Sequence, residues 1–149
     1  MKERILVLQS VNDQITRFRE IRIKQSPFLQ NYEFKYVYII KLTSNDKRNK
    51  QTIEKAIERA LNTSLDEKEL TRRLKLEILR FNPNYLIVHA GMGFLRFTGQ
   101  ILNSLMAIKA DHPNLIIGLE RHRWHNTNMQ LPPIFDMSQK TVKLIEEIF

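Results

Sequence analysis

The sequence predicts a single α/β domain spanning residues 1–149, built on one layer of four or five mostly parallel strands with helices on both faces. Three observations predict this fold. Apolar runs alternate with amphipathic segments along the chain, three of the runs are continuously apolar, and no repeat, low-complexity tract or linker divides the sequence. Continuously apolar runs are typical of strands that are covered on both faces, as the strands of parallel sheets are.

The expected strands are short and well separated. Residues 4–8, 84–89 and 115–119 are apolar runs, and residues 34–42 are aromatic and β-branched, which favours a strand. Residues 131–135 contain two prolines, so this segment is either a short edge strand or a loop.

The segment 17–24 is ambiguous, because its residues fit both a helix and an alternating strand. We favour a helix that begins after a cap at Ser10 or Asn12 and that carries Ile15, Phe18 and Ile21 on its apolar face.

Helical spacing of apolar residues predicts four further helices. They cover residues 52–61, a segment opened by a capping box of Ser64 and Glu67, one long helix from Leu95 to Ile108, and a closing helix capped by Asp136 or Ser138.

The charge balance points to anionic partners. There are 24 Lys and Arg against 16 Asp and Glu, a formal net charge of +8. Such a field attracts phosphate-bearing ligands and nucleic acid, but without a base-reading motif it supports only non-specific binding to nucleic acid. The chain has no cysteine, which excludes a disulfide scaffold, a thiolate metal site and a cysteine nucleophile.

Apolar runs are too short for a membrane segment. They reach only four or five residues, as at residues 85–88, whereas a span needs about 20 residues, and only four apolar residues follow the basic residues near Met1. We therefore expect a cytoplasmic protein without a signal peptide, a membrane partner or a cofactor.

The fold itself nominates a site, because ligands of open parallel sheets bind at the carboxyl ends of the strands. Residues 9–13, 89–94 and 120–125 would meet there. From the first stretch we take Ser10, Asn12 and Asp13 as candidate ligand-binding residues.

Gly91 and Gly93 lie between an expected strand and an expected helix. Backbone amides at such a turn can hold phosphate, and Arg96, one helical turn further on, would close over it. The alternative is an ordinary tight turn, since the spacing matches no nucleotide-binding motif.

Residues 120–125 combine a carboxylate, two guanidinium groups and two imidazoles directly after a buried strand. With His89 they offer either an anion site or the ligands of a metal; the arginines favour the anion, so we predict no metal site. In the enzymatic alternative His89 or His122 is a general base oriented by Glu120, and Arg121, Arg123 and His125 bind the ligand. The other alternative is a polar loop anchored by Trp124.

From residue 82 onward the chain resembles response-regulator receiver domains, which have a flavodoxin-like fold. The similarity rests on residues 82–94 (NPNYLIVHAGMGF), 112–117 (HPNLII) and 133–137 (PIFDM), and it covers about half of the chain. The residues of receiver chemistry are not carried over. His89 stands where that family has the phosphate-accepting Asp, Gln9 and Ser10 stand where it has an acidic pair, and Pro132 stands where it has a Lys.

The resemblance therefore implies a degenerate receiver-like module that works without Asp phosphorylation. Our leading hypothesis is a non-catalytic regulatory or partner-binding domain that self-associates as a homodimer. The alternative is a domain that binds, or a hydrolase that cleaves, a phosphate-bearing ligand such as a nucleotide or a phosphodiester in the crevice formed by His89 and residues 120–125.

Overall fold

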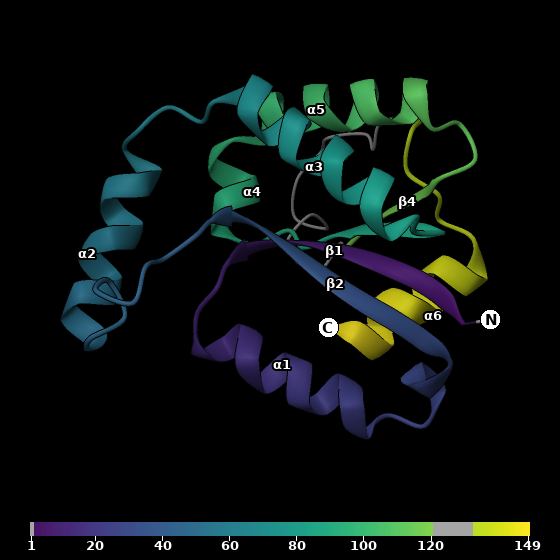
Figure 1. Cartoon of the computed structure of the whole chain (residues 1–149), viewed down its shortest axis with the longest axis horizontal. Helices are drawn as coiled ribbons and strands as arrows, with labels where there is room; N and C mark the ends of the chain where they lie inside the picture. Colours follow the sequence, from purple (N-terminus) through teal and green to yellow (C-terminus); the bar gives the residue numbers. More distant parts are fainter. Residues whose placement is uncertain (1, 121–132) are drawn as a thin grey trace.

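The computed structural model describes residues 2–120 and 133–149, without the side chains of residues 14–16. Predictions that concern residues 121–132 lie outside the described residues. Four strands form one all-parallel sheet in the order β2-β1-β3-β4 (Figure 1). The strands are β1 (Glu3–Val11), β2 (Tyr32–Ile40), β3 (Tyr85–Val88) and β4 (Ile116–Leu119).

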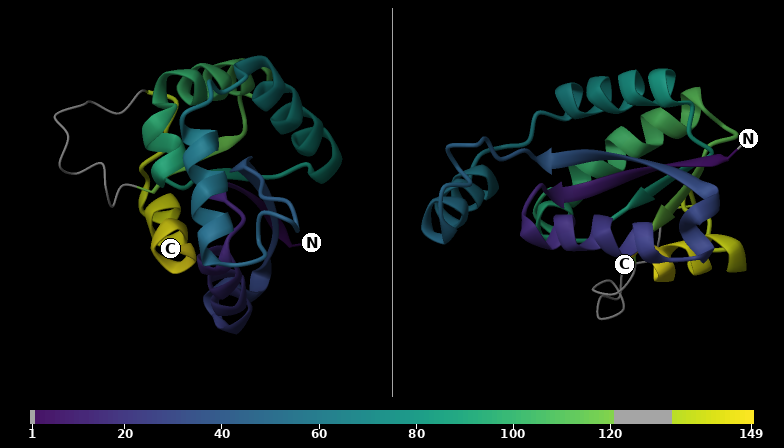
Figure 2. Two further views of the ribbon diagram at one scale, coloured as in Figure 1. Left: turned by 90° about the vertical axis from the view of Figure 1, so that its left-hand side faces the viewer. Right: turned by 60° about the horizontal axis from the view of Figure 1, so that its bottom comes forward.

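Helices cover both faces of this sheet (Figures 1 and 2). One face carries α1, the short 3-10 helix η1 and α6; the other carries α3, α4 and α5. The helix α2 lies beyond the carboxyl end of β2, at one end of the molecule. Their bounds are α1 (Gln14–Gln25), η1 (Phe28–Asn31), α2 (Lys50–Leu61), α3 (Glu67–Phe81), α4 (Met92–Arg96), α5 (Thr98–Asp111) and α6 (Gln139–Ile148).

Successive side chains of a strand point to opposite faces of the sheet, so they pack in two separate hydrophobic cores. On β1, Leu6 and Leu8 pack beneath α3 and α5, while Ile5 and Val7 pack against α6, and all four are fully buried. A strand with two buried faces needs apolar residues at consecutive positions, which explains the continuous apolar runs. The predicted fold class is confirmed: this is a single-layer, flavodoxin-like α/β arrangement.

The ambiguous segment 17–24 is helical, within α1, but its apolar face was predicted wrongly. Phe18 is 70% exposed and Ile21 is 52% exposed, while Ile23 is only 5% exposed and packs on the sheet. The reason is that α1 also turns polar side chains inward, where Arg19 and Glu20 reach Gln9 and Tyr38 on the strands.

The predicted caps of α1 are also wrong. Ser10 lies within β1, and the side chain of Asn12 bonds the backbone of Leu42, donating to its carbonyl at 3.1 Å and accepting from its N–H at 2.6 Å. Asn12 therefore ties the segment after β1 to the segment after β2 instead of capping a helix.

Two other helix boundaries differ from the prediction. The cap of α3 is Asp66, whose carboxylate accepts from the N–H of Glu69 at 3.1 Å, so Ser64 does not form the capping box. The single long helix is divided into α4 and α5, because Phe97 leaves helical geometry (φ −118°, ψ 32°) while its side chain is 4% exposed. Apolar spacing cannot reveal such a break, since it continues across it.

The structure of the last segments of the chain is closer to what the sequence predicts. Phe135 forms one parallel bridge with Ile117, so only this residue of the proposed edge strand pairs with the sheet among those the structure describes. Ser138 caps α6 by accepting from the N–H of Thr141, as one of the two predicted alternatives. Within the described ranges, no helix has both the length and the apolar character that crossing a membrane requires.

Candidate functional site

The carboxyl ends of β1, β3 and β4 lie together at one end of the sheet, and 'the edge' in this section means this carboxyl end. The N–H of His89 donates to the carbonyl of Leu8 at 2.9 Å, and the N–H of Glu120 donates to the carbonyl of Val88 at 2.8 Å. These bonds continue the parallel ladders past the strand ends. His89 and Glu120, which are distant in sequence, are therefore both held at the edge where the sequence places a site.

A hydrogen-bonded chain of side chains crosses this edge. The guanidinium of Arg19 donates to Oε1 of Gln9 at 2.8 Å, and Nε2 of Gln9 lies 3.2 Å from Nδ1 of His89. Gln9 is 3% exposed. Because a guanidinium only donates, the Gln9 oxygen faces Arg19 and its amide NH₂ faces His89. The amide NH₂ also only donates, so Nδ1 of His89 is the acceptor in this contact.

Several charged or ionisable groups surround Arg19, among them the like-charged Arg22. Burial lowers the pKa of Arg19, and the nearby Tyr36, Asp13 and Glu120 oppose that effect. The carboxylate residue Glu120 is 7% exposed. We call Gln9, Arg19, His89 and Glu120 the edge cluster. It unites a guanidinium, a carboxylate, an imidazole and an amide in a largely buried setting.

The terminal turn of α6 completes the surroundings of the edge cluster. The guanidinium of Arg19 lies 4.7 Å from the centre of the Phe149 ring, and the His89 ring stacks on the same ring at 5.0 Å. Arg22 donates to the carbonyl of Phe149 at 2.7 Å. Cation–π contact and stacking thus fix the orientation of both Arg19 and His89.

Ser10 lies beside the turn at Gly91. It is 2% exposed, and its Oγ has no hydrogen-bond partner among the described residues. A Cβ on Gly91 would come within 2.5 Å of this oxygen and 2.7 Å of Nδ1 of His89. Glycine is therefore needed at position 91 for a steric reason, whereas a Cβ added to Gly93 would lie 3.4 Å from the Ser10 side chain.

Other predicted site residues are placed differently. The guanidinium of Arg96 donates to the carbonyl of Leu61 at 2.9 Å and lies over the Phe97 ring, so it is directed to the end of α2. Asp13, by contrast, stays near the edge cluster: its charge acts on Arg19, and its carbonyl accepts from the N–H of Arg17 at the start of α1. Arg121, His122, Arg123 and His125 lie outside the described residues.

Two members of the edge cluster were missed as site residues. Gln9 carries a signal in retrospect, since it is a polar residue within a buried run at a position that alternates with Ile5 and Val7. Arg19 carries none, because a single arginine in an amphipathic segment is typical of a solvated helix face. Its partner is ten residues away and is defined only by how α1 packs on the sheet.

Aromatic residues of β2 lie near this edge. The Tyr36 and Tyr38 rings stack with their centres 6.3 Å apart, and the Tyr38 hydroxyl donates to Glu20 at 3.3 Å. Burial, reinforced by the negative charge of Glu20, raises the pKa of Tyr36 and raises that of Tyr38 to about 12. Both phenols are consequently neutral at physiological pH.

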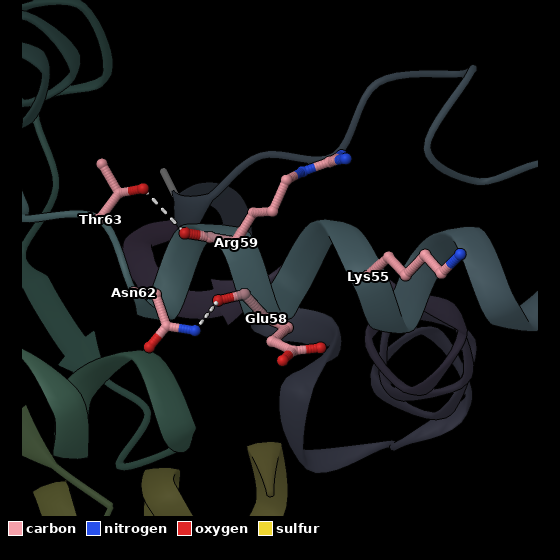
Figure 3. A pocket seen from close by; sticks show the side chains of 5 residues that line it. All are labelled: Lys55, Glu58, Arg59, Asn62 and Thr63. Atoms are coloured by element: carbon pink, nitrogen blue, oxygen red, sulfur yellow. Dashed lines mark hydrogen bonds between the residues drawn. The ribbon is translucent and has the colours of Figure 1, made fainter.

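The helix α2 borders several surface hollows. A groove between α2 and α4 is lined by Glu54, Ile57, Glu58, Leu61, Asn62, Met92 and Arg96. A second hollow, shown in Figure 3, lies along α2 itself and is lined by Lys55, Glu58, Arg59, Asn62 and Thr63. There the Asn62 and Thr63 side chains donate to the carbonyls of Glu58 and Arg59, so these polar groups satisfy the end of the helix.

No group of three or more potential metal-ligating side chains occurs in the described part of the chain. The edge cluster instead has the composition of an anion-binding or hydrogen-bonding site, with Arg19 as its cation.

Comparisons of the chain with protein-family models, with curated proteins and with solved structures find no match.

Proposed function

We propose that this chain is a non-catalytic, receiver-like regulatory module that binds a protein partner and does not use aspartyl phosphorylation. The observation that carries the proposal is the hydrogen-bonded chain from Arg19 through Gln9 to His89. These side chains occupy the edge at which an open parallel sheet places its chemistry. They are bonded to one another, and Arg19 supplies there the positive charge that a metal ion would otherwise bring.

The partner-binding part of the proposal is supported by apolar residues beside the same edge. Met92 and Leu95 on α4 are 43% and 41% exposed. Met92 also lines the groove between α2 and α4, together with Ile57 and Leu61. Apolar side chains gathered at a groove with a charged rim are typical of sites that bind other proteins.

A first experiment tests the absence of phosphorylation chemistry. The protein is titrated with Mg²⁺ and beryllofluoride, an aspartyl-phosphate mimic, and followed by thermal unfolding and by amide NMR spectra. A phosphorylatable receiver domain serves as the positive control. We expect no change in the spectra or in Tm, and a Mg²⁺-dependent response to beryllofluoride would contradict the proposal.

A second experiment tests the partner surface. Met92→Glu places a charge in the α2–α4 groove, and Leu79→Glu is the matched control, since Leu79 is 78% exposed on α3. We expect a partner captured by the wild-type protein and by L79E to be lost by M92E, with Tm unchanged. Equal capture by both variants would exclude this groove as the partner site.

The second candidate function is binding of a phosphate-bearing ligand. The unpartnered Ser10 hydroxyl beside the Gly91 turn favours it, because a buried hydroxyl without a partner among the described residues is a suitable donor to a phosphate oxygen. Thermal unfolding in the presence of nucleotides and cyclic nucleotides distinguishes the two functions. Stabilisation that disappears in both His89→Ala and Arg121→Ala would favour the phosphate ligand, and no stabilisation across the panel would favour the regulatory module.

A further inference from the structure

The strand β2 has a long open edge. It is the outermost strand in the order β2-β1-β3-β4, and β1 is its strand partner among the described residues. In Figure 1 it crosses the front of the molecule, with α3 above it and α1 below it, and no helix passes in front. Its nine residues, YEFKYVYII, contain neither proline nor glycine. Such an edge is a template for pairing with another strand unless something covers it.

Side chains of β2 divide cleanly between the two faces of the sheet. Phe34 and Tyr36 lie with the core beneath α1 and α6. On the opposite face Lys35 forms an ion pair with Glu77 of α3 at 2.6 Å. Glu33, which alternates with Lys35, pairs with Arg4 at 3.1 Å. Both ion pairs are open to solvent, since the Glu33 and Lys35 side chains are 47% and 43% exposed.

We propose that this edge pairs with the β2 edge of a second copy, antiparallel and about a two-fold axis at Phe34, so that the two sheets join into one. In this register Glu33 of each copy lies opposite Lys35 of the other, so the same pair of opposite charges forms twice. On the other face Phe34 lies opposite Phe34, and Tyr32 lies opposite Tyr36. Aromatic pairs of this kind stabilise neighbouring strands.

Neighbouring registers are less favourable. An axis at Glu33 would place two glutamates opposite each other, and an axis at Lys35 would place two lysines opposite each other. Like charges directly opposite destabilise a strand pair. An axis at Tyr36 would place Lys35 opposite Val37, which is 7% exposed. The charge pattern of β2 thus selects one self-complementary register.

A side chain of α3 limits which residues of β2 can pair with the second copy. Arg73 of α3 donates to the carbonyl of Tyr38 at 2.9 Å. Carbonyls of alternate residues in a strand point to the same side, so those of Phe34 and Tyr36 share the direction of Tyr38. Arg73 covers the edge at Tyr38, whereas the register centred on Phe34 uses residues 32–36 and leaves Tyr38 to Arg73.

This inference rests on the partner-binding role proposed above, because it names a second copy of the chain as one partner. The two proposals use different surfaces. The groove between α2 and α4 and the edge of β2 can therefore be altered separately, and one can fail while the other stands.

The experiment uses charge reversal in the full chain, with association measured by analytical ultracentrifugation over a range of concentrations. Glu33→Lys and Lys35→Glu each place like charges opposite in both symmetry-related pairs, and we expect each to weaken dimerisation about tenfold or more. Mixing the two variants makes all four positions complementary again, so we expect a one-to-one heterodimer. Lys55→Glu on α2 and Glu146→Lys on α6, both at exposed positions, are the matched controls and should dimerise like the wild type.

A cross-link tests the register directly, since the chain has no cysteine of its own. Directly opposite residues in a hydrogen-bonded antiparallel pair have Cα atoms about 5.5 Å apart, which suits a disulfide. We expect Phe34→Cys to form a covalent dimer on mild oxidation, whereas Tyr36→Cys, which has Tyr32 opposite it, should not.

Three outcomes would overturn the proposal. They are a wild-type protein that stays monomeric at all concentrations, charge variants that dimerise like the wild type, and a mixture of E33K and K35E that forms no heterodimer. None of them would affect the Mg²⁺ and beryllofluoride titration or the M92E test, which address the proposed function.

Discussion

Gly91 is the residue at which the edge of the sheet is most tightly constrained. A side chain there would meet the Ser10 hydroxyl and the His89 ring, and Gln9 and Arg19 in turn fix the position of that ring. The space for one methyl group at position 91 therefore determines whether the side chains of the edge cluster can keep their positions. The requirement for glycine arises from this close approach, because no described glycine has a positive φ.

The first prediction follows from this close approach. Gly91→Ala should lower the free energy of unfolding by about 1–3 kcal/mol, since Ser10 and His89 must move to admit the methyl group. Gly99→Ala is the control, with the opposite effect expected. Nothing lies within 4 Å of the Cβ position of Gly99 on α5, so this change should raise the free energy of unfolding by roughly 0.4–1 kcal/mol. Urea unfolding measures both. A G91A variant as stable as the wild type would show that the turn has room.

A second prediction at this scale concerns the tyrosines of β2. The folded state raises the pKa of Tyr38 to about 12, chiefly through burial and then through Glu20, and Tyr36 is raised in the same direction. Because the unfolded chain releases these protons near pH 10, their contribution to stability is complete below that pH and is lost as the pH rises toward 12.

Tyrosinate absorbance and denaturant unfolding between pH 8 and 12 check this prediction. Tyr38→Phe should make the alkaline loss of stability less steep. If all four tyrosines of the chain titrated near pH 10 in the folded protein, the prediction would be wrong.

At the scale of elements, α2 stands out as the least attached helix. It lies beyond the carboxyl end of β2 (Figure 1), and Ala56 is its one buried residue. Its start is well formed, because Asn49 and Thr52 make a reciprocal capping box. Its end is held to the body of the protein by the bond from Arg96 to the carbonyl of Leu61.

The third prediction is that Arg96→Ala loosens α2 without unfolding the domain. Loss of this charged donor should cost on the order of 1 kcal/mol locally. Hydrogen exchange of the α2 amides should quicken while exchange in β1 and β3 stays unchanged. Arg72→Ala is the control, since Arg72 pairs with Glu69 on its own helix, and equal effects of the two variants would contradict the assigned role of Arg96.

At the scale of the whole molecule, the net charge of +8 acts through its long-range field. The positive residues are spread over several elements, and some of them already form ion pairs, such as Lys75 with Asp111 and Lys140 with Glu3. A dispersed field of this kind attracts polyanions without selecting a sequence.

The fourth prediction is therefore that any binding to nucleic acid is non-specific. Fluorescence anisotropy with duplexes of unrelated sequence should give similar affinities, and these should fall steeply as the salt concentration rises. Binding that discriminates between sequences, or that persists at high salt, would contradict this.

The sequence by itself determined the parallel sheet, the expected position of its carboxyl edge and the placing of His89 and Glu120 along it. The physical reason is local: a strand buried on both faces requires consecutive apolar residues, and strand ends in a parallel sheet share an edge. The sequence also predicted the helical state of residues 17–24, which lie within α1.

Only the tertiary structure decided how the helices are rotated against the sheet. That rotation brings Arg19 to Gln9, leaves Phe18 and Ile21 exposed, and directs Arg96 to α2. It also places a break at Phe97 within a continuous apolar pattern. These features depend on contacts between residues far apart in the chain, and hydrophobic spacing describes one segment at a time, so it carries no information about which side chains meet.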